Sequence, residues 1–180
     1  MSPTTYITDA VTLGTGLLLA RLIVGLLMVA HGGQKLFGWL GGYGIAGTAG
    51  FFEQLGFRPG RLFVVTASLA EVLSGILIAL GLFGPVGPAL LLSVMIVAAV
   101  SVHWKHGLFA ATNGIEVPLL YATGAVALGF TGHGPFSLDA VLGIDHIWAP
   151  GLKAVALAVG AVGGVANLLA RRSAAVAATA

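Results

Sequence analysis

Two ionisable residues lie inside long apolar stretches of the chain, where lipid would be expected to surround them. Arg21 interrupts the apolar stretch 11–37, and Glu71 interrupts the stretch 62–83. Because a charge in hydrocarbon is costly, an intramembrane Arg or Glu normally faces another protein group or a water-filled cavity. The sequence therefore predicts a membrane protein with a polar interior, and it places the candidate chemistry in that interior.

The depths of these two residues predict an ion pair between them. If 11–37 descends from one membrane face and 62–83 ascends back to it, Arg21 lies about 15 Å deep and Glu71 about 18 Å deep, at ~1.5 Å per residue. Such a pair can fix the register of two helices without adding net stability. It can also bind a substrate or relay a proton, and the sequence leaves both roles open.

A second cluster of ionisable residues is expected at one membrane boundary. His31 and Lys35 are four residues apart and share a face of the first predicted helix. His103 closes the third predicted helix and Glu116 opens the fourth. These four residues are candidates to line a polar pocket, in which imidazole and ammonium groups could bind and protonate a quinone carbonyl. Metal binding is the weaker alternative and we predict no metal site, because no His-x-x-x-His or Glu-x-x-His pair lies on one helix.

Five apolar stretches must position these residues, and we predict that each is a transmembrane helix. They cover residues 11–37, 62–83, 89–104, 117–131 and 150–170. A bilayer core of ~30 Å needs roughly 20 residues, so the third and fourth stretches are short. Between the first two stretches, a glycine-rich connection leads into the amphipathic segment 48–56, which we expect to lie along the membrane interface.

The composition supports a membrane protein independently of these stretches. Hydrophobic residues make up 58% of the chain and charged residues 8%, with a mean hydropathy of +1.03. A soluble domain has roughly 25% charged residues. The fold class predicted is all-α, a polytopic transmembrane helix bundle in the lipid bilayer, and the net charge of +2 does not indicate a nucleic-acid partner. The absence of cysteine excludes disulfides, redox dithiols and thiolate-ligated iron–sulfur centres within this chain.

The positive charges predict an orientation. Apart from Arg21, the chain has seven cations; six of them are predicted on one side of the five spans, and Lys153 is the exception. The six are Lys35, Arg58, Arg61, Lys105, Arg171 and Arg172. Short loops rich in Lys and Arg stay in the cytoplasm, so the N-terminus is predicted outside and the C-terminus in the cytoplasm.

Several segments carry a family pattern when they are taken in order. The pattern comprises Arg21 with AHGGQKLF at 30–37, FFEQLGFRP at 51–59, AEVLSG at 70–75 with LGLFG at 80–84, His103 with GLF at 107–109 and NGIE at 113–116, and GPFSLD at 134–139. Together they span about residues 13–142 and resemble the DoxX family of small bacterial integral membrane proteins.

The resemblance implies an organisation and a location. It implies an N-terminal tail at 1–12, a four-helix DoxX-like bundle at 13–142, and localisation in the bacterial inner membrane. The additional transmembrane helix in 143–172 extends beyond the usual family domain, and we expect it to serve oligomerisation or partner docking. Residues 173–180 are predicted to form a disordered tail.

The resemblance also implies candidate functions. Family members are associated with quinone-linked sulfur oxidation as a membrane subunit of thiosulfate:quinone oxidoreductase, with an assembly containing superoxide dismutase and a sulfurtransferase, and with maturation of methylamine dehydrogenase. The positions that match the family pattern are the six candidates already named, Arg21, His31, Lys35, Glu71, His103 and Glu116.

Two classes of function follow. In the first, the chain is the membrane subunit of a quinone-linked redox complex. It would hold no covalent cofactor, would bind a quinone, and would receive electrons from a soluble or membrane oxidoreductase partner, because it lacks cysteines and flavin or haem motifs. In the second, it is a non-enzymatic membrane scaffold or a small-solute transporter. The sequence leaves open whether the chain is an enzyme, what its substrate is, and whether it forms a homo-oligomer.

Overall fold

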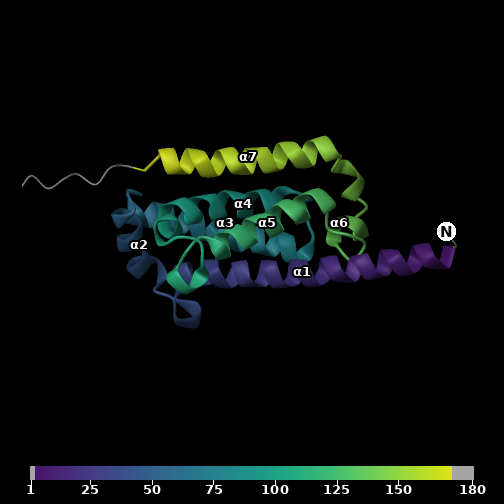
Figure 1. Cartoon of the computed structure of the whole chain (residues 1–180), viewed down its shortest axis with the longest axis horizontal. Coiled ribbons are helices and arrows are strands. Elements are labelled where there is room, and N and C mark those ends of the chain that lie inside the picture. The colour runs from purple at the N-terminus through teal and green to yellow at the C-terminus, as the bar shows by residue number, and fades with distance from the viewer. Residues whose placement is uncertain (1–2, 172–180) are drawn as a thin grey trace, which may run out of the picture.

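The structure, a computed structural model, describes residues 3–171, and these form a bundle of long helices (Figure 1). The α-helices are α1 Pro3–Phe37, α2 Gly44–Gln54, α3 Gly60–Leu80, α4 Val86–Ala98, α5 Glu116–Thr131, α6 Leu138–Val141 and α7 Pro150–Leu169. A π-helical turn, η2 Ala99–His103, continues α4, and short 3-10 turns fill the connections. No strand occurs within 3–171. The predicted all-α helical bundle is confirmed.

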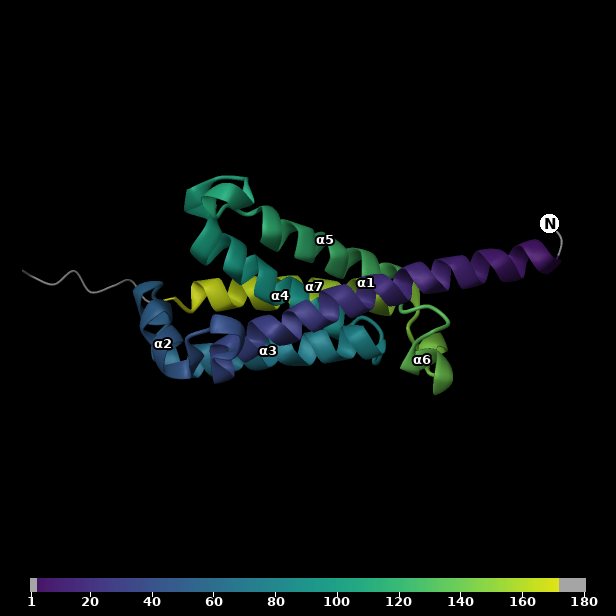
Figure 2. The ribbon, with the colours of Figure 1, turned by 90° about the horizontal axis from the view of Figure 1, so that it is seen from below.

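Four helical segments are long and apolar enough to cross a membrane. They are Asp9–Phe37, Gly60–Leu80, Val86–His106 and Pro150–Leu169. The fifth predicted span, α5, has only 16 residues, or about 24 Å at 1.5 Å per residue, and runs obliquely to α1 (Figure 2). The chain is therefore a membrane protein whose surface contacts lipid, and α5 completes the bundle as a shorter helix.

The start of the first predicted helix requires a correction, whereas its end at Phe37 is as predicted. α1 begins at Pro3, so most of the predicted tail 1–12 is helical, and this part of α1 extends beyond the rest of the bundle (Figure 1). The described chain starts at the end that carries α6, here called the α6 end. It finishes at the end that carries α2, here called the α2 end. The predicted tail 173–180 lies outside the described residues.

Glycines bring α1 and α3 into backbone contact. A Cβ on Gly25 would lie 2.5 Å from the carbonyl oxygen of Gly75, and one on Gly32 would lie 2.7 Å from that of Ser68. In both contacts the residue numbers sum to 100, as expected for antiparallel helices in one register. This register fixes which residues of the two helices share a level in the membrane.

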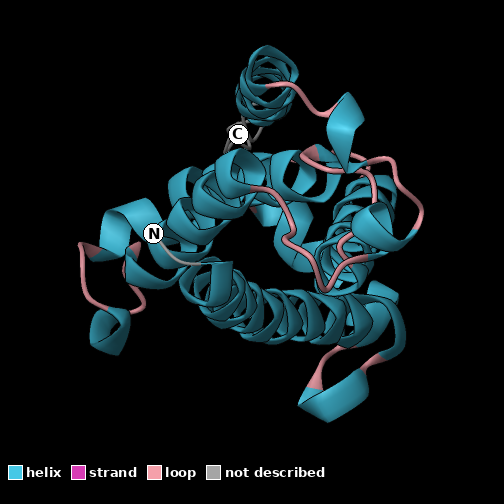
Figure 3. Cartoon of the chain, turned by 90° about the vertical axis from the view of Figure 1, so that its right-hand side faces the viewer, coloured by secondary structure: helices cyan, strands magenta, loops and turns pink. Residues whose placement is uncertain are grey.

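The C-terminal helix α7 packs on α4 through a second glycine pair. A Cβ on Gly160 would collide with the backbone of Ala89, and one on Gly164 would lie 2.9 Å from the carbonyl oxygen of Ser93. The view along the bundle places α7 outside the other long helices (Figure 3). The G-x-x-x-G spacing of α7 thus serves packing within the chain.

Candidate functional site

A cavity of about 320 Å³ opens near the α2 end and is here called the α2-end pocket. Its walls come from the end of α1, from α2, α3, and α4 with η2, and from the last turns of α7. Most of the lining is apolar and includes the aromatic rings of Phe51, Phe52, Phe57 and Phe63. The polar groups central to its chemistry are Lys35, Glu71, Ser101 and His103. The pocket is therefore an apolar chamber with a few polar groups in its wall, which is usual for small-molecule sites.

An ion pair between Lys35 and Glu71 forms part of that wall. The Lys35 Nζ lies 2.5 Å from Glu71 Oε1 and 2.6 Å from Oε2. The Glu71 side chain is 6% exposed and that of Lys35 28%. Helical side chains lean toward the N-terminus of their own helix. Because α1 and α3 are antiparallel, Lys35 and Glu71 lean toward each other and meet between their two levels.

The predicted Arg21–Glu71 ion pair is wrong, and the register and antiparallel direction of α1 and α3 explain why. In the register of α1 and α3, Glu71 lies level with residue 29, about 12 Å from the level of Arg21 at 1.5 Å per residue. The two side chains also lean away from each other. Arg21 instead lies fully buried at the α6 end, where its Nη2 donates to the carbonyl oxygen of Phe136 at 2.5 Å.

The π-helical turn η2 positions the remaining polar groups of the pocket. A π turn is wider than an α turn and is often found at functional sites, and here it brings Ser101 and His103 to the same wall. Within the part of the chain that the structure describes, the Ser101 Oγ is buried without a hydrogen-bond partner. The His103 Nδ1 lies 2.8 Å from the carbonyl oxygen of Asn113. Because a carbonyl only accepts, Nδ1 carries a proton and Nε2 is the nitrogen that exchanges protons when the ring is neutral.

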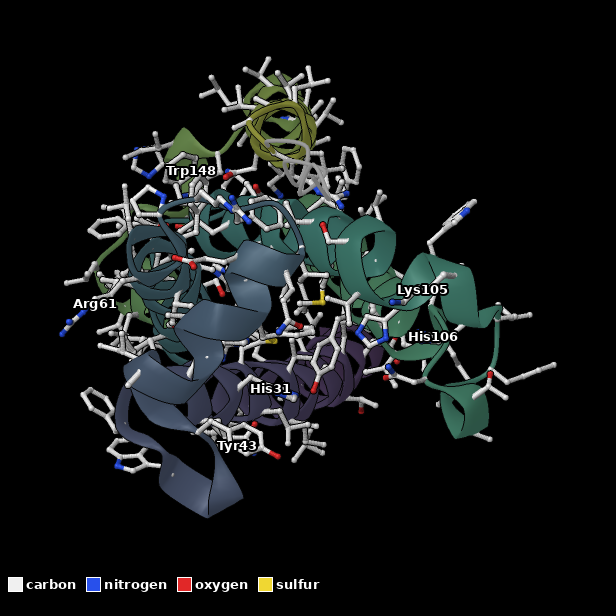
Figure 4. The ribbon with its side chains drawn as sticks, turned by 90° about the vertical axis from the view of Figure 1, so that its left-hand side faces the viewer. His31, Tyr43, Arg61, Lys105, His106 and Trp148 are labelled. Atoms are coloured by element: carbon white, nitrogen blue, oxygen red, sulfur yellow. The ribbon has the colours of Figure 1, made fainter. Side chains whose placement is uncertain are left out.

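Two of the four predicted pocket residues do not line the α2-end pocket. His31 is exposed on α1 and its ring meets the Tyr121 ring of α5 edge-on, with 6.2 Å between centroids (Figure 4). Glu116 accepts a hydrogen bond from the Ala110 backbone N–H at 2.7 Å and so orders the loop before α5. The α2-end pocket thus contains two of the four predicted residues, Lys35 and His103, together with Glu71 and Ser101. His31 and Glu116 lie outside it.

Lys35 also borders a second, more open depression of about 500 Å³ under the connection from α1 to α2. Phe51 lines both spaces, whereas Gln34, Tyr43 and Thr48 line only the outer one. Lys35 therefore stands between the α2-end pocket and the outside of the bundle.

The sequence model of the DoxX family matches residues 16–104. Every residue lining the α2-end pocket falls in that segment except Asn167 of α7. No curated protein and no solved structure matches the chain. The helices, the matched segment and the order of its motifs lead to one assignment: the chain belongs to the DoxX family.

Proposed function

We propose that this protein is the membrane subunit of a quinone-linked redox complex and that the α2-end pocket holds the head group of the quinone. The observation that supports this most directly is the Lys35–Glu71 ion pair in the wall of a mostly apolar cavity. A lipid-soluble molecule with polar carbonyls needs such a combination of apolar walls and a few fixed donors.

The residues present fit a quinone. The two carbonyl oxygens of a quinone accept hydrogen bonds, and the pocket offers the Lys35 ammonium and the unpartnered hydroxyl of Ser101. Aromatic side chains from α2, α3 and the turn between them can pack against its ring. The buried Ser101 hydroxyl would gain a partner that it lacks within residues 3–171.

The same residues can deliver protons. A quinone takes up two electrons and two protons when it is reduced. Lys35 can donate a proton to a carbonyl oxygen beside it, and the Glu71 carboxylate then favours return of a proton to the amine, because an uncompensated buried anion is costly. Lys35 borders the open depression, so that proton can come from outside the bundle. His103, with Nε2 as its exchanging nitrogen, supplies a second route.

Electrons must come from an oxidoreductase partner, because the chain has no cysteine and no motif for a flavin or haem. The α2 end carries exposed cations, including Arg61 and Lys105, which lie on opposite flanks of the bundle (Figure 4). Under the positive-inside rule this end faces the cytoplasm of a bacterial inner membrane. We therefore expect the electron-donating partner on the cytoplasmic side.

Binding of a short-chain quinone to the purified protein in lipid nanodiscs tests the proposal. Ser101→Ala and His103→Ala should each weaken binding roughly three- to tenfold, as expected for loss of about 1 kcal/mol of hydrogen bonding. His31→Ala is the matched control, since His31 lies near the same membrane boundary but outside the pocket. Equal affinities for the two histidine variants would contradict the proposal. Solute movement into liposomes by the same protein would then favour the transporter alternative.

A further inference from the structure

A second cavity, of about 340 Å³, lies at the α6 end and is here called the α6-end pocket. It is formed by the connection after α5, by α6, and by the start of α7. The lining residues that matter here are His133, Asp139, Asp145, Trp148 and Lys153. No residue that lines it also lines the α2-end pocket, so it is separate from the proposed quinone site.

The buried carboxylate in this pocket has its own partners. Asp139 Oδ1 accepts from the Phe83 N–H at 2.8 Å, and Oδ2 accepts from the Gly84 N–H at 2.7 Å. His133 Nδ1 lies 3.4 Å from Oδ2. Because an ionised carboxylate only accepts, Nδ1 is the protonated nitrogen of the neutral ring. Asp139 therefore anchors His133 and leaves its other nitrogen, Nε2, to a ligand.

Unpaired nitrogens concentrate at this end of the bundle. Six buried side-chain polar atoms lack a partner within the described chain, and four are nitrogens at the α6 end. These four are Arg21 Nε, Arg21 Nη1, His133 Nε2 and Trp148 Nε1. A buried polar group without a partner is unfavourable, whether it is a donor or an acceptor, and such groups are rare in native proteins. The Lys153 ammonium adds a charged donor to the wall, with a hydrogen bond to the carbonyl oxygen of Phe130 at 3.1 Å.

The formal charges of the four ionised groups around His133 cancel. Arg21 on α1 and Lys153 on α7 are positive, whereas Asp139 on α6 and Asp145 before α7 are negative. Burial lowers the pKa of His133 below its ordinary value of 6.5; Asp139 opposes this shift, and Arg21 and Lys153 reinforce it. At neutral pH the site is therefore balanced, and uptake of one proton by His133 would make it positive.

We propose that the α6-end pocket binds a small free oxyanion, either a carboxylate or an inorganic oxyanion. The indole N–H of Trp148 and the ammonium of Lys153 donate to its oxygens, and His133 Nε2 donates once it has taken up a proton. Arg21 does not line the pocket, but its positive charge lies close to it. We assign a free anion and not a lipid phosphate, because the unpaired nitrogens are buried and a lipid phosphate carries two ester substituents.

The experiment follows the ¹⁵N indole signals of the full chain in phosphatidylcholine nanodiscs during titration with sodium sulfate or sodium acetate, at a constant ionic strength set with sodium chloride. The chain has three tryptophans, and Trp148→Phe assigns the signal of interest by its loss. We expect a saturable shift of the Trp148 signal. The affinity should rise as the pH falls from 7.5 to 5.5, by at most about tenfold per pH unit, because the bound state holds one more proton.

Lys153→Met should weaken the affinity about tenfold or more, as expected for a charged hydrogen bond. Lys105→Met, which removes an exposed lysine at the α2 end, should leave it unchanged. The proposal is overturned by the absence of a saturable shift with either anion, by an affinity that does not change with pH, or by equal shifts of all three indoles. A shift that appears only when anionic lipid replaces phosphatidylcholine would assign the site to a lipid phosphate and would also overturn it.

Discussion

At the scale of single residues, Glu71 forms an ion pair with Lys35. Lys35 reaches it from a position on α1 nearer the α2 end. The pair is partly sheltered from water, and removing one member leaves the other charge uncompensated. Replacing both by apolar residues of similar volume avoids that penalty. The pair is thus expected to be strongly coupled in stability.

The coupling gives the first prediction of this section. Lys35→Met alone should lower the unfolding free energy by about 3 kcal/mol, because it leaves a buried carboxylate without a partner. The double variant Lys35→Met with Glu71→Leu should recover most of that loss. Thermal or denaturant unfolding in detergent measures both. Additive losses in the double variant would show that the two side chains do not interact.

Arg21 and Glu71 lie inside the bundle, as their positions in apolar stretches predict, but their partners could not be deduced from spacing alone. Depth in the membrane suggested Arg21 for Glu71, while the lean of side chains on antiparallel helices favours Lys35. His31 and Lys35 share a face of α1, yet only the longer Lys35 reaches the α2-end pocket, and the imidazole of His31 meets Tyr121. Ser101 was missed because no sequence signal marks the π turn that presents it.

At the scale of elements, the glycine contact of α1 and α3 sets the level of every charged group in the α2-end pocket. Gly25 and Gly75 allow the two backbones to touch, and small residues commonly serve this purpose between membrane helices. Any side chain at Gly25 must push α3 away and with it Glu71.

Gly25→Ala should therefore destabilise the protein by about 1 to 3 kcal/mol, the usual cost of overpacking. Gly16→Ala is the matched control on the same helix, since a Cβ there would meet nothing within 4 Å. The control should be neutral or more stable by up to about 1 kcal/mol, because alanine favours helix over glycine. Unfolding in detergent compares the two variants, and equal stabilities would contradict the α1–α3 contact.

The apolar stretches predicted the number and order of the main helices, because lipid-facing segments must be long and apolar. The helix ends were harder to predict. α1 continues through residues 4–9, which are mostly polar and carry no apolar pattern, and α4 passes into η2 without any break in hydropathy. Tertiary contacts, which the sequence does not display, determine these ends.

At the scale of the whole molecule, the bundle carries two different pockets at opposite ends, one apolar with an ion pair and one rich in unpaired nitrogens. Exposed cations gather at the α2 end, where Arg58, Arg61, Lys105 and Arg171 lie. Arg172, predicted at the same end, is outside the described residues. The proposed orientation places the α2-end pocket at the cytoplasmic face and the α6-end pocket at the opposite one.

Single cysteines in this cysteine-free chain test that orientation. Ala111 and Ala149 are both exposed, in the connection before α5 and just before α7, at the two ends of the bundle. In intact cells, Ala149→Cys should react with a membrane-impermeant maleimide, whereas Ala111→Cys should react only after permeabilisation. The reverse labelling would invert the orientation and place the α2-end pocket outside the cell.

The location of a bound quinone tests the central claim most directly. A photoreactive short-chain quinone is activated with the protein in nanodiscs, and the labelled peptides are mapped by mass spectrometry. The account predicts label on the walls of the α2-end pocket, in the segments 51–63 and 97–103, with loss of label when unmodified quinone competes. Label spread over the lipid-facing side of α7, or label that unmodified quinone does not displace, would contradict a quinone site in this pocket.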